Sequence, residues 1–265
     1  MKFEIKVPGS CGELVQGFYH GEPILITCPI EKFSSAVATD EFFCAKNLGE
    51  KSLLMLEKVL RFFKSTDFNF GVYLSSELPH GKGMSSSSAD LSAVAKVVSL
   101  ALKKNLTAEK ISELAAEIEP TDGVFFDGVV AMNPVTGKFI KQIFLPEKYF
   151  IAVFDYGGEV DTVKFNRRGD FQIEFLDENL NFELVKKSAL ANQKILFKPN
   201  LNAIINFAEE LGAVTVNIAH SGTVIGIFFH ADDLSIKEKI LAIQKKFECI
   251  KFLTLTKLTH GGFYE

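Results

Sequence analysis

The chain has 265 residues, of which 47% are hydrophobic and 23% are charged, and its net charge is −4. These values are ordinary for a folded globular protein and exclude a disordered chain. The acidic balance, without a basic stripe, excludes a general nucleic-acid surface, and no apolar run approaches the ~18 residues that a membrane span needs.

The cysteines and the N-terminus indicate where the protein resides. The four cysteines, at positions 11, 28, 44 and 249, form no C-x-x-C pair and have no zinc-ligand spacing with histidine. Residues 1–7 alternate in polarity and lack the apolar core of a signal peptide. We therefore expect a reduced, cytoplasmic protein.

In the first half of the chain, alternating and helical patterns succeed one another. Phe3, Ile5 and Val7 alternate with charged residues and predict a strand that ends at residues 8–9. Further strands are predicted at 23–28, 33–39 and 68–76, and helices at 50–64, from about 86 to 102, and after a Thr107 cap.

The second half favours an α+β fold. We predict strands at 129–132 and 149–154, a polar region around 157–181 that marks a lobe boundary, and helices at 184–196 and 200–211. The remaining predictions are strands at 214–219 and 224–229, a helix at 234–247 and a strand at 251–256. Strand–strand–helix–strand after paired helices is not the regular alternation of a doubly wound sheet.

Residues 79–88 combine glycines and serines between a predicted strand and a predicted helix. Gly81 and Gly83 would let the backbone approach an anion closely, and Ser85–Ser88 would occupy the first helical turn, where N–H groups and hydroxyls meet a phosphate. Lys82 could add a cation. The alternative is a flexible turn with a serine N-cap.

Two well-known phosphate loops are excluded at this stretch. A P-loop requires glycine five positions before Gly81, where Ser76 stands, and Ser or Thr after Lys82, where Gly83 stands. The dinucleotide fingerprint fails because its third glycine is replaced by Ser86.

Three segments together resemble the GHMP kinases. Residues 79–89, Pro-His-Gly-Lys-Gly-Met-Ser-Ser-Ser-Ser-Ala, resemble that family's P-x-G-x-G-L-x-S-S-A loop; residues 8–17 and 219–226 fall where the family has its other two motifs. Ser85 departs from the usual glycine, and Thr223 from the common proline. The resemblance implies an ATP-dependent kinase with an N-terminal lobe (1–150) like domain 2 of ribosomal protein S5 and a ferredoxin-like C-terminal lobe (151–265).

The branch of the family is indicated by residues 8–17, Pro-Gly-Ser-Cys-Gly-Glu-Leu-Val-Gln-Gly, and by residues 119–123 and 154–167. They are similar to the branch that contains L-threonine kinase of cobalamin synthesis, also labelled propanediol-utilisation kinase. The implied product is O-phospho-L-threonine. Three alternatives remain. The chain could be a homoserine kinase, a GHMP kinase for another small alcohol, or a non-catalytic ligand sensor on the same fold.

The resemblance also assigns roles at the phosphate side. Asp122 is expected to face the substrate hydroxyl, either as a base or by positioning it, with a plain Thr-Asp-Gly turn as the alternative. Ser87 and Glu119 are the expected Mg²⁺ ligands, with Glu117 second. Lys82 is a candidate catalytic cation. The residues expected to hold the phosphates are Pro79, His80, Gly81, Lys82, Gly83, Met84, Ser85, Ser86, Ser87 and Ser88.

On the substrate side, the expected ligand is a small amino acid that carries a hydroxyl. Glu13 could pair with its ammonium group, or it could simply be part of a structural turn. The other expected contacts, for each of which a plain turn or polar loop is the alternative, are Ser221, Gly222, Thr223, Thr162 and Asn166. No nucleic-acid or membrane partner is expected, and the protein is expected to be a monomer or homodimer.

Overall fold

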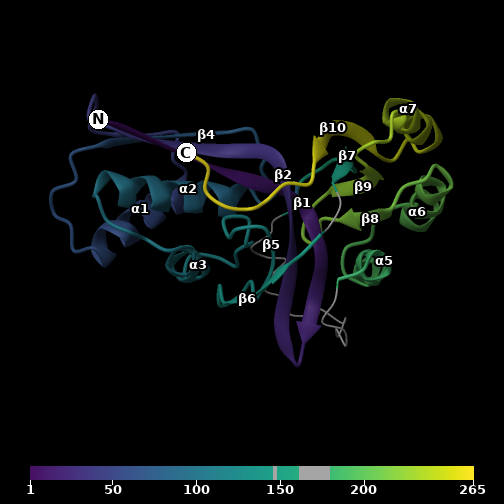
Figure 1. Cartoon of the computed structure of the whole chain (residues 1–265), viewed down its shortest axis with the longest axis horizontal. Coiled ribbons are helices and arrows are strands. Elements are labelled where there is room, and N and C mark those ends of the chain that lie inside the picture. The colour runs from purple at the N-terminus through teal and green to yellow at the C-terminus, as the bar shows by residue number, and fades with distance from the viewer. Residues whose placement is uncertain (146–147, 161–179) are drawn as a thin grey trace.

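The computed structural model describes residues 1–145, 148–160 and 180–265 (Figure 1). Its strands are β1 (Lys2–Tyr19), β2 (Glu22–Thr39), β3 (Ala45–Lys46), β4 (Gly71–Ser76), β5 (Val129–Met132), β6 (Phe139–Ile143), β7 (Tyr149–Asp155), β8 (Thr215–Ile218), β9 (Val224–His230) and β10 (Lys251–Lys257). Its helices are α1 (Glu50–Phe62), α2 (Ser86–Ala101), α3 (Ala108–Ala116), α5 (Phe182–Ala191), α6 (Leu201–Glu210) and α7 (Ile236–Lys246), with a 3-10 turn at Asn192–Lys194.

One curled sheet connects the two ends of the molecule. Its strand order is β10-β7-β9-β8-β1-β2-β4-β3, with β5 and β6 attached beside β2. The strands β1 and β8 meet at the single pair Glu13–Ile218. Helices α1–α3 lie at one end and α5–α7 at the other (Figure 1). The predicted α+β class is confirmed.

The prediction that the first strand ends at residues 8–9 is wrong. Strand β1 continues to Tyr19, and its pairing with β2 shifts register between Pro8 and Gly9 and again between Ser10 and Glu13. Bulges accommodate the proline and the glycines, because an unpaired residue in a bulge leaves no ladder bond to break. Likewise, the two strands predicted at 23–28 and 33–39 form one strand, β2.

Helix α2 is the most deeply buried helix of the N-terminal half. It packs on β1, β2 and α1, and all but three of its sixteen residues are buried. The short side chains Ala89, Ala93 and Ala95 allow this close approach. The helix that starts at the Gly/Ser stretch is thus held rigidly from behind, so its N-terminus has a fixed position.

The other elements follow the predictions with small shifts. Helix α1 and the Thr107 N-cap of α3 are confirmed, the hydroxyl of Thr107 accepting from the Lys110 N–H at 3.3 Å. Strands β3 and β6 were missed. The first has only two residues, and the second mixes its apolar residues with Lys141 and Gln142. No helix in the described ranges is long and apolar enough to cross a membrane.

The C-terminal segment returns to the N-terminal half. After β10, Leu258 and Thr259 bond to β7 and β2, and Tyr264 exchanges two main-chain hydrogen bonds with Lys6 at 2.8 and 2.9 Å. Both ends of the chain therefore lie near one another (Figure 1). The predicted division at residue 150 stays a prediction.

Candidate active site

The three glycine-containing segments singled out in the sequence meet at the centre of the sheet. Main-chain atoms join them: the segment 8–17 and the turn 219–226 both bond to the loop 79–85. The bonds are Ser10 N–H to Met84 O (3.0 Å), Gly12 N–H to Gly83 O (3.0 Å), and Thr223 N–H to Lys82 O (2.9 Å). Residues far apart in sequence thereby form one platform.

Glycine is required where the loop touches the turn. Gly83 has φ +79°, and a Cβ there would lie 2.3 Å from Ala219 Cβ. A Cβ on Gly222 would lie 2.3 Å from Lys82 O. No side chain fits at either position, so the contact fixes the height of the loop above the sheet.

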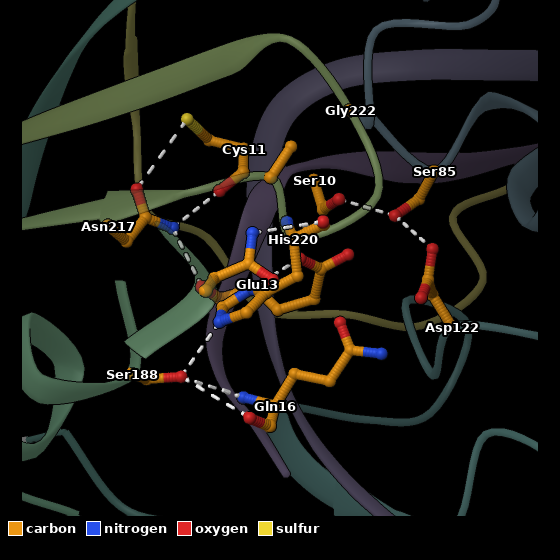
Figure 2. Close-up of polar contacts among 12 residues, drawn as sticks. Ser10, Cys11, Glu13, Gln16, Ser85, Asp122, Ser188, Asn217, His220 and Gly222 are labelled. Carbon is orange, nitrogen blue, oxygen red and sulfur yellow. Dashed lines mark hydrogen bonds and ion pairs between the residues drawn. The ribbon is translucent and has the colours of Figure 1, made fainter. Parts of the chain in front are cut away.

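The loop ends at the N-terminus of α2, where Ser85 is the N-cap residue. Ser85 is in the left-handed region at φ 53°, a conformation that costs a non-glycine residue about 1 kcal/mol. Its hydroxyl makes no capping bond and instead donates to Asp122 Oδ2 at 2.6 Å. It also contacts Ser10 Oγ (Figure 2). The hydroxyl thus serves the site rather than the helix.

A cleft of about 790 Å³ opens in front of this helix N-terminus. The loop lines one wall, and residues 47–52, at the start of α1, line another. The first N–H groups of a helix have no partner within the helix, and the helix dipole favours negative charge there. The cleft can therefore take a phosphate chain at this end.

The Ser87 hydroxyl donates to Glu119 Oε1 on the wall of the cleft. Lys51, from the first turn of α1, holds the other oxygen of Glu119 at 2.5 Å. The Glu119 side chain is 9% exposed, so a positive partner is needed there. The second candidate, Glu117, points elsewhere, since its carboxylate pairs with Lys58 and is largely exposed.

Asp122 lines the cleft. Its N–H donates to Ser88 Oγ at 3.0 Å, which fixes the backbone behind the carboxylate. Burial, and then the nearby negative charge of Glu13, raise the pKa of Asp122 to about 7, against the lowering effect of the Ser85 hydrogen bond. A carboxyl group with such a pKa can exchange a proton near neutral pH.

Glu13 belongs to a buried chain of hydrogen bonds. Its Oε2 accepts from the main-chain N–H and from Nδ1 of His220, at 2.9 and 3.0 Å. His220 Nε2 lies 2.8 Å from Ser188 Oγ, which also accepts from the Gln16 N–H at 3.1 Å (Figure 2). His220 is therefore a buried, hydrogen-bonded histidine that contacts the site through Glu13.

A second, smaller pocket of about 120 Å³ adjoins Asp122. Asp122, Glu13 and Ser221 line both hollows, whereas Gln16 lines only the small one. The apolar remainder of its wall comes from the β1–β2 hairpin and from residues 120 and 134–135: Phe18, Pro23, Ile24, Leu25, Pro120, Pro134 and Val135. Asp122 thus stands at the junction of a large polar cleft and a small, partly apolar pocket.

Lys82 does not face the cleft. Its ammonium group donates to Asp155 Oδ2 at 2.7 Å and to Gly158 O at 2.6 Å. Asp155 Oδ1 accepts from the Thr223 hydroxyl at 2.5 Å. These bonds fasten the loop to the turn from behind, and Lys82 as a catalytic cation stays a prediction without geometric support.

The predicted site residues divide into three groups. Among them, those lining the cleft are His80, Gly81, Gly83, Met84, Ser85, Ser86, Ser87, Ser88, Glu119, Asp122, Glu13 and Ser221. Lys82, Gly222 and Thr223 lie outside its lining and join the loop to the turn, and Pro79 also lies outside the lining. Thr162 and Asn166 lie outside the described residues.

Sequence reasoning missed four residues of this region. Gln16 and Lys51 line the two hollows, Asp155 binds Lys82, and Lys198 donates from a buried position to Ala219 O and Gly222 O at 2.9 and 3.1 Å. Burial lowers the pKa of Lys198 to about 8. Gln16 and Asp155 lie in the segments 8–17 and 154–167, but no role was assigned to them, and no local motif marks Lys51 or Lys198.

A glycine loop at a helix N-terminus, a Ser–Glu pair and a buried carboxylate at the junction with a second pocket define a phosphotransferase site. Residues 48–131 match the family model described as "GHMP kinases N terminal domain". Over 244 residues, the chain is 27% identical to L-threonine kinase of Salmonella typhimurium, covering 83% of this chain and 80% of that protein. It is 26% identical to L-threonine kinase of Citrobacter freundii, with 83% and 84% covered.

Solved structures share the fold. Mevalonate kinase of Methanococcus jannaschii has a TM-score of 0.70 at 16% identity, with 98% of this chain and 99% of that chain covered. Homoserine kinase of Cytophaga hutchinsonii has a TM-score of 0.67 at 13% identity, with 99% and 96% covered. Through residues 48–131 the chain is similar to the GHMP kinases, and the comparisons together indicate an ATP-dependent phosphotransferase that acts on an alcohol.

Proposed function

We propose that this kinase transfers the γ-phosphoryl group of MgATP to the hydroxyl of L-threonine, giving O-phospho-L-threonine for cobalamin side-chain synthesis in the cytoplasm. The observation that carries the proposal is the position of Asp122, which lines both the large cleft and the small pocket. A phosphate chain in the cleft and a hydroxyl in the pocket would meet at this carboxylate. The two curated relatives with matching length are both L-threonine kinases.

The described residues suit a magnesium ion that arrives with the nucleotide. Mg²⁺ in kinase sites takes one or two carboxylates, phosphate oxygens and water. Glu119 and Ser87 supply a carboxylate and a hydroxyl in contact on the cleft wall. No group of three His, Cys, Asp or Glu side chains that could hold a metal alone occurs in the described part of the chain. When bound, the ion would neutralise charge on the β- and γ-phosphates.

The chain's own groups then align the reaction. The α2 N-terminus and the glycine loop would hold the phosphates, and Asp122 would accept the proton of the attacking hydroxyl. Ser85, bonded to Asp122 at 2.6 Å, fixes the carboxylate in place. Phosphoryl transfer needs mainly positioning and charge stabilisation, so this small set of groups suffices.

The test is a coupled assay of ADP release with MgATP and a panel of alcohols: L-threonine, L-serine, L-homoserine and mevalonate. We expect L-threonine to give the highest kcat/KM. Turnover of homoserine or mevalonate without turnover of threonine would overturn the substrate assignment and leave the kinase class intact. A thermal shift with MgATP serves as a control for nucleotide binding, because a ligand of the native state raises apparent stability.

A further inference from the structure

The small pocket beside Asp122 contains a polar group without a partner. The side-chain oxygen of Gln16, Oε1, is buried and has no hydrogen bond to any described residue. Gln16 itself is 8% exposed and lines this pocket. A buried amide oxygen without a donor is unfavourable, and natural proteins keep such groups mainly where a ligand or ordered water completes them.

The backbone of Gln16 cannot shift to give its side-chain oxygen a hydrogen-bond donor. The main-chain N–H of Gln16 donates to Ser188 Oγ at 3.1 Å, and Gln16 lies in β1, where it pairs with Leu25 of β2. The side chain turns toward the same space as Glu13 and Asp122 (Figure 2). The Gln16 side chain is thus held at the wall of the pocket by a fixed strand.

The neighbouring acceptors are also in excess. Both His220 donors go to Oε2 of Glu13, and no other described residue donates to its Oε1. The negative charge of Glu13 raises the pKa of Asp122, so the two carboxyl groups interact electrostatically. Of the described residues that line the pocket, none is Lys or Arg; the buried Lys198 interacts with the charge of Glu13 from outside the lining, where it donates to Ala219 O and Gly222 O. The pocket therefore offers negative charge and acceptors to a ligand that must bring donors and positive charge.

We propose that Gln16 Oε1 and Glu13 form a subsite for the primary ammonium group of the acceptor, while the acceptor's hydroxyl faces Asp122. This inference rests on the proposed function and narrows it to a class: alcohols with an amino group on the adjacent carbon. L-Threonine is one member. Its carboxyl-free analogue, 1-amino-2-propanol, belongs to the same class because it keeps both groups that this subsite and Asp122 contact.

The test compares acceptors that differ by one group, using full-length protein. L-Threonine has both the amine and the carboxylate, 1-amino-2-propanol lacks the carboxylate, and 3-hydroxybutyrate lacks the amine. Affinities are measured by calorimetry with a non-hydrolysable ATP analogue and Mg²⁺, and as KM where turnover occurs. For Gln16→Met we expect weaker binding of both amines by about 10- to 100-fold, the size of a hydrogen bond to a charged group, and a change below about 2-fold for 3-hydroxybutyrate.

Two further variants serve as controls for Gln16→Met. Gln16→Glu keeps an acceptor oxygen in place and should retain the preference for amines over 3-hydroxybutyrate. Val135→Ala changes the apolar wall of the same pocket and should affect all three acceptors by similar factors. Equal losses for amine-bearing and amine-free acceptors in Gln16→Met would overturn the proposal, and so would binding of amine-free alcohols as tight as that of amines to the wild type.

The outcomes separate this inference from the substrate assignment. If threonine fails but another vicinal amino alcohol reacts with a Gln16-dependent KM, the subsite stands and the assignment to threonine falls. If amine-free alcohols react as well as threonine does, the subsite falls and the kinase remains.

Discussion

The two hollows that meet at Asp122 are built in different ways. The large cleft takes its phosphate-facing wall from one stretch, residues 80–88 without Lys82, and offers mainly main-chain N–H groups and hydroxyls. The small pocket draws on four separate segments and is polar through the buried side chains of Glu13 and Gln16 and the half-buried side chain of Asp122. A phosphate needs donors that glycine and a helix supply locally, whereas an ammonium group needs buried acceptors, and these need partners from elsewhere in the fold.

The largest effect is expected from a substitution of Asp122, the residue at which the two hollows meet. Asp122→Asn keeps the shape of the side chain but removes the base. We expect kcat to fall by about 10²- to 10⁴-fold, the usual size of general base catalysis, with a KM for MgATP within about 3-fold of wild type. Steady-state kinetics with Asp127→Asn, an exposed aspartate of the same segment, provide the matched control.

The pH profile tests the same carboxylate. Because the pKa of Asp122 is raised to about 7, its basic form increases as pH rises through neutrality. The wild-type kcat/KM should therefore rise with pH and level off above about 7. This rising limb of the pH profile should be absent in Asp122→Asn. A limb that persists in the variant would show that another group is the base.

The next effect concerns the nucleotide side alone. Gly83→Ala would place a Cβ 2.3 Å from Ala219 Cβ and lift the loop from the turn. We expect a rise of about 10-fold or more in the KM for MgATP, because phosphate binding depends on the close approach of the loop backbone. Gly21→Ala is the control: Gly21 also has a positive φ, +78°, but nothing lies within 4 Å of its added Cβ. Equal effects in the two variants would attribute the loss to backbone strain rather than to the contact.

A smaller effect is expected at Ser85, which joins the helix N-terminus to Asp122. Ser85→Gly removes the hydroxyl that lowers the pKa of Asp122 and places the residue best suited to φ 53° in the N-cap. We expect an unchanged or higher melting temperature, a kcat lower by about 10-fold, and a pH limb displaced upward. Loss of stability together with activity would contradict this interpretation, because the backbone prefers glycine there.

The smallest effect is on stability. The pKa of Asp122 is near 3.9 in an unfolded chain and is raised in the folded state, so the folded state binds the proton more tightly. The unfolded state then holds fewer protons, and the free energy of unfolding falls as pH rises between about 4 and 7. Asp122→Asn should remove this part of the decline and melt a few degrees above wild type at pH 8, as measured by calorimetry.

The difference between the hollows also explains what the sequence could predict. The Gly/Ser loop and the helix after it were evident from a dozen consecutive residues, and α1, α2 and the Thr107 cap followed from periodicity and capping chemistry. The sequence ranked Glu119 ahead of Glu117 as a Mg²⁺ ligand, and the fold places Glu119 on the cleft wall and Glu117 on the surface.

Residues that act across the sheet could not be predicted. The partner of Lys82 is Asp155, which is 73 positions away, and the partner of Glu13 is His220, 207 positions away. Lys198 resembles any surface lysine until its burial is known. The continuity of β1 through Pro8 and Gly9 was also hidden, because bulges compensate for residues that interrupt an isolated strand.

The main-chain bonds between the three glycine segments have a consequence for redesign. Since Ser10, Gly12 and Thr223 contact the loop through their N–H groups, the platform under the nucleotide is largely independent of the side chains that surround the acceptor. Pocket residues such as Phe18 or Val135 point to a separate hollow and can be exchanged while that platform is kept. The molecule thus suits the engineering of new acceptor alcohols on a constant phosphate donor site.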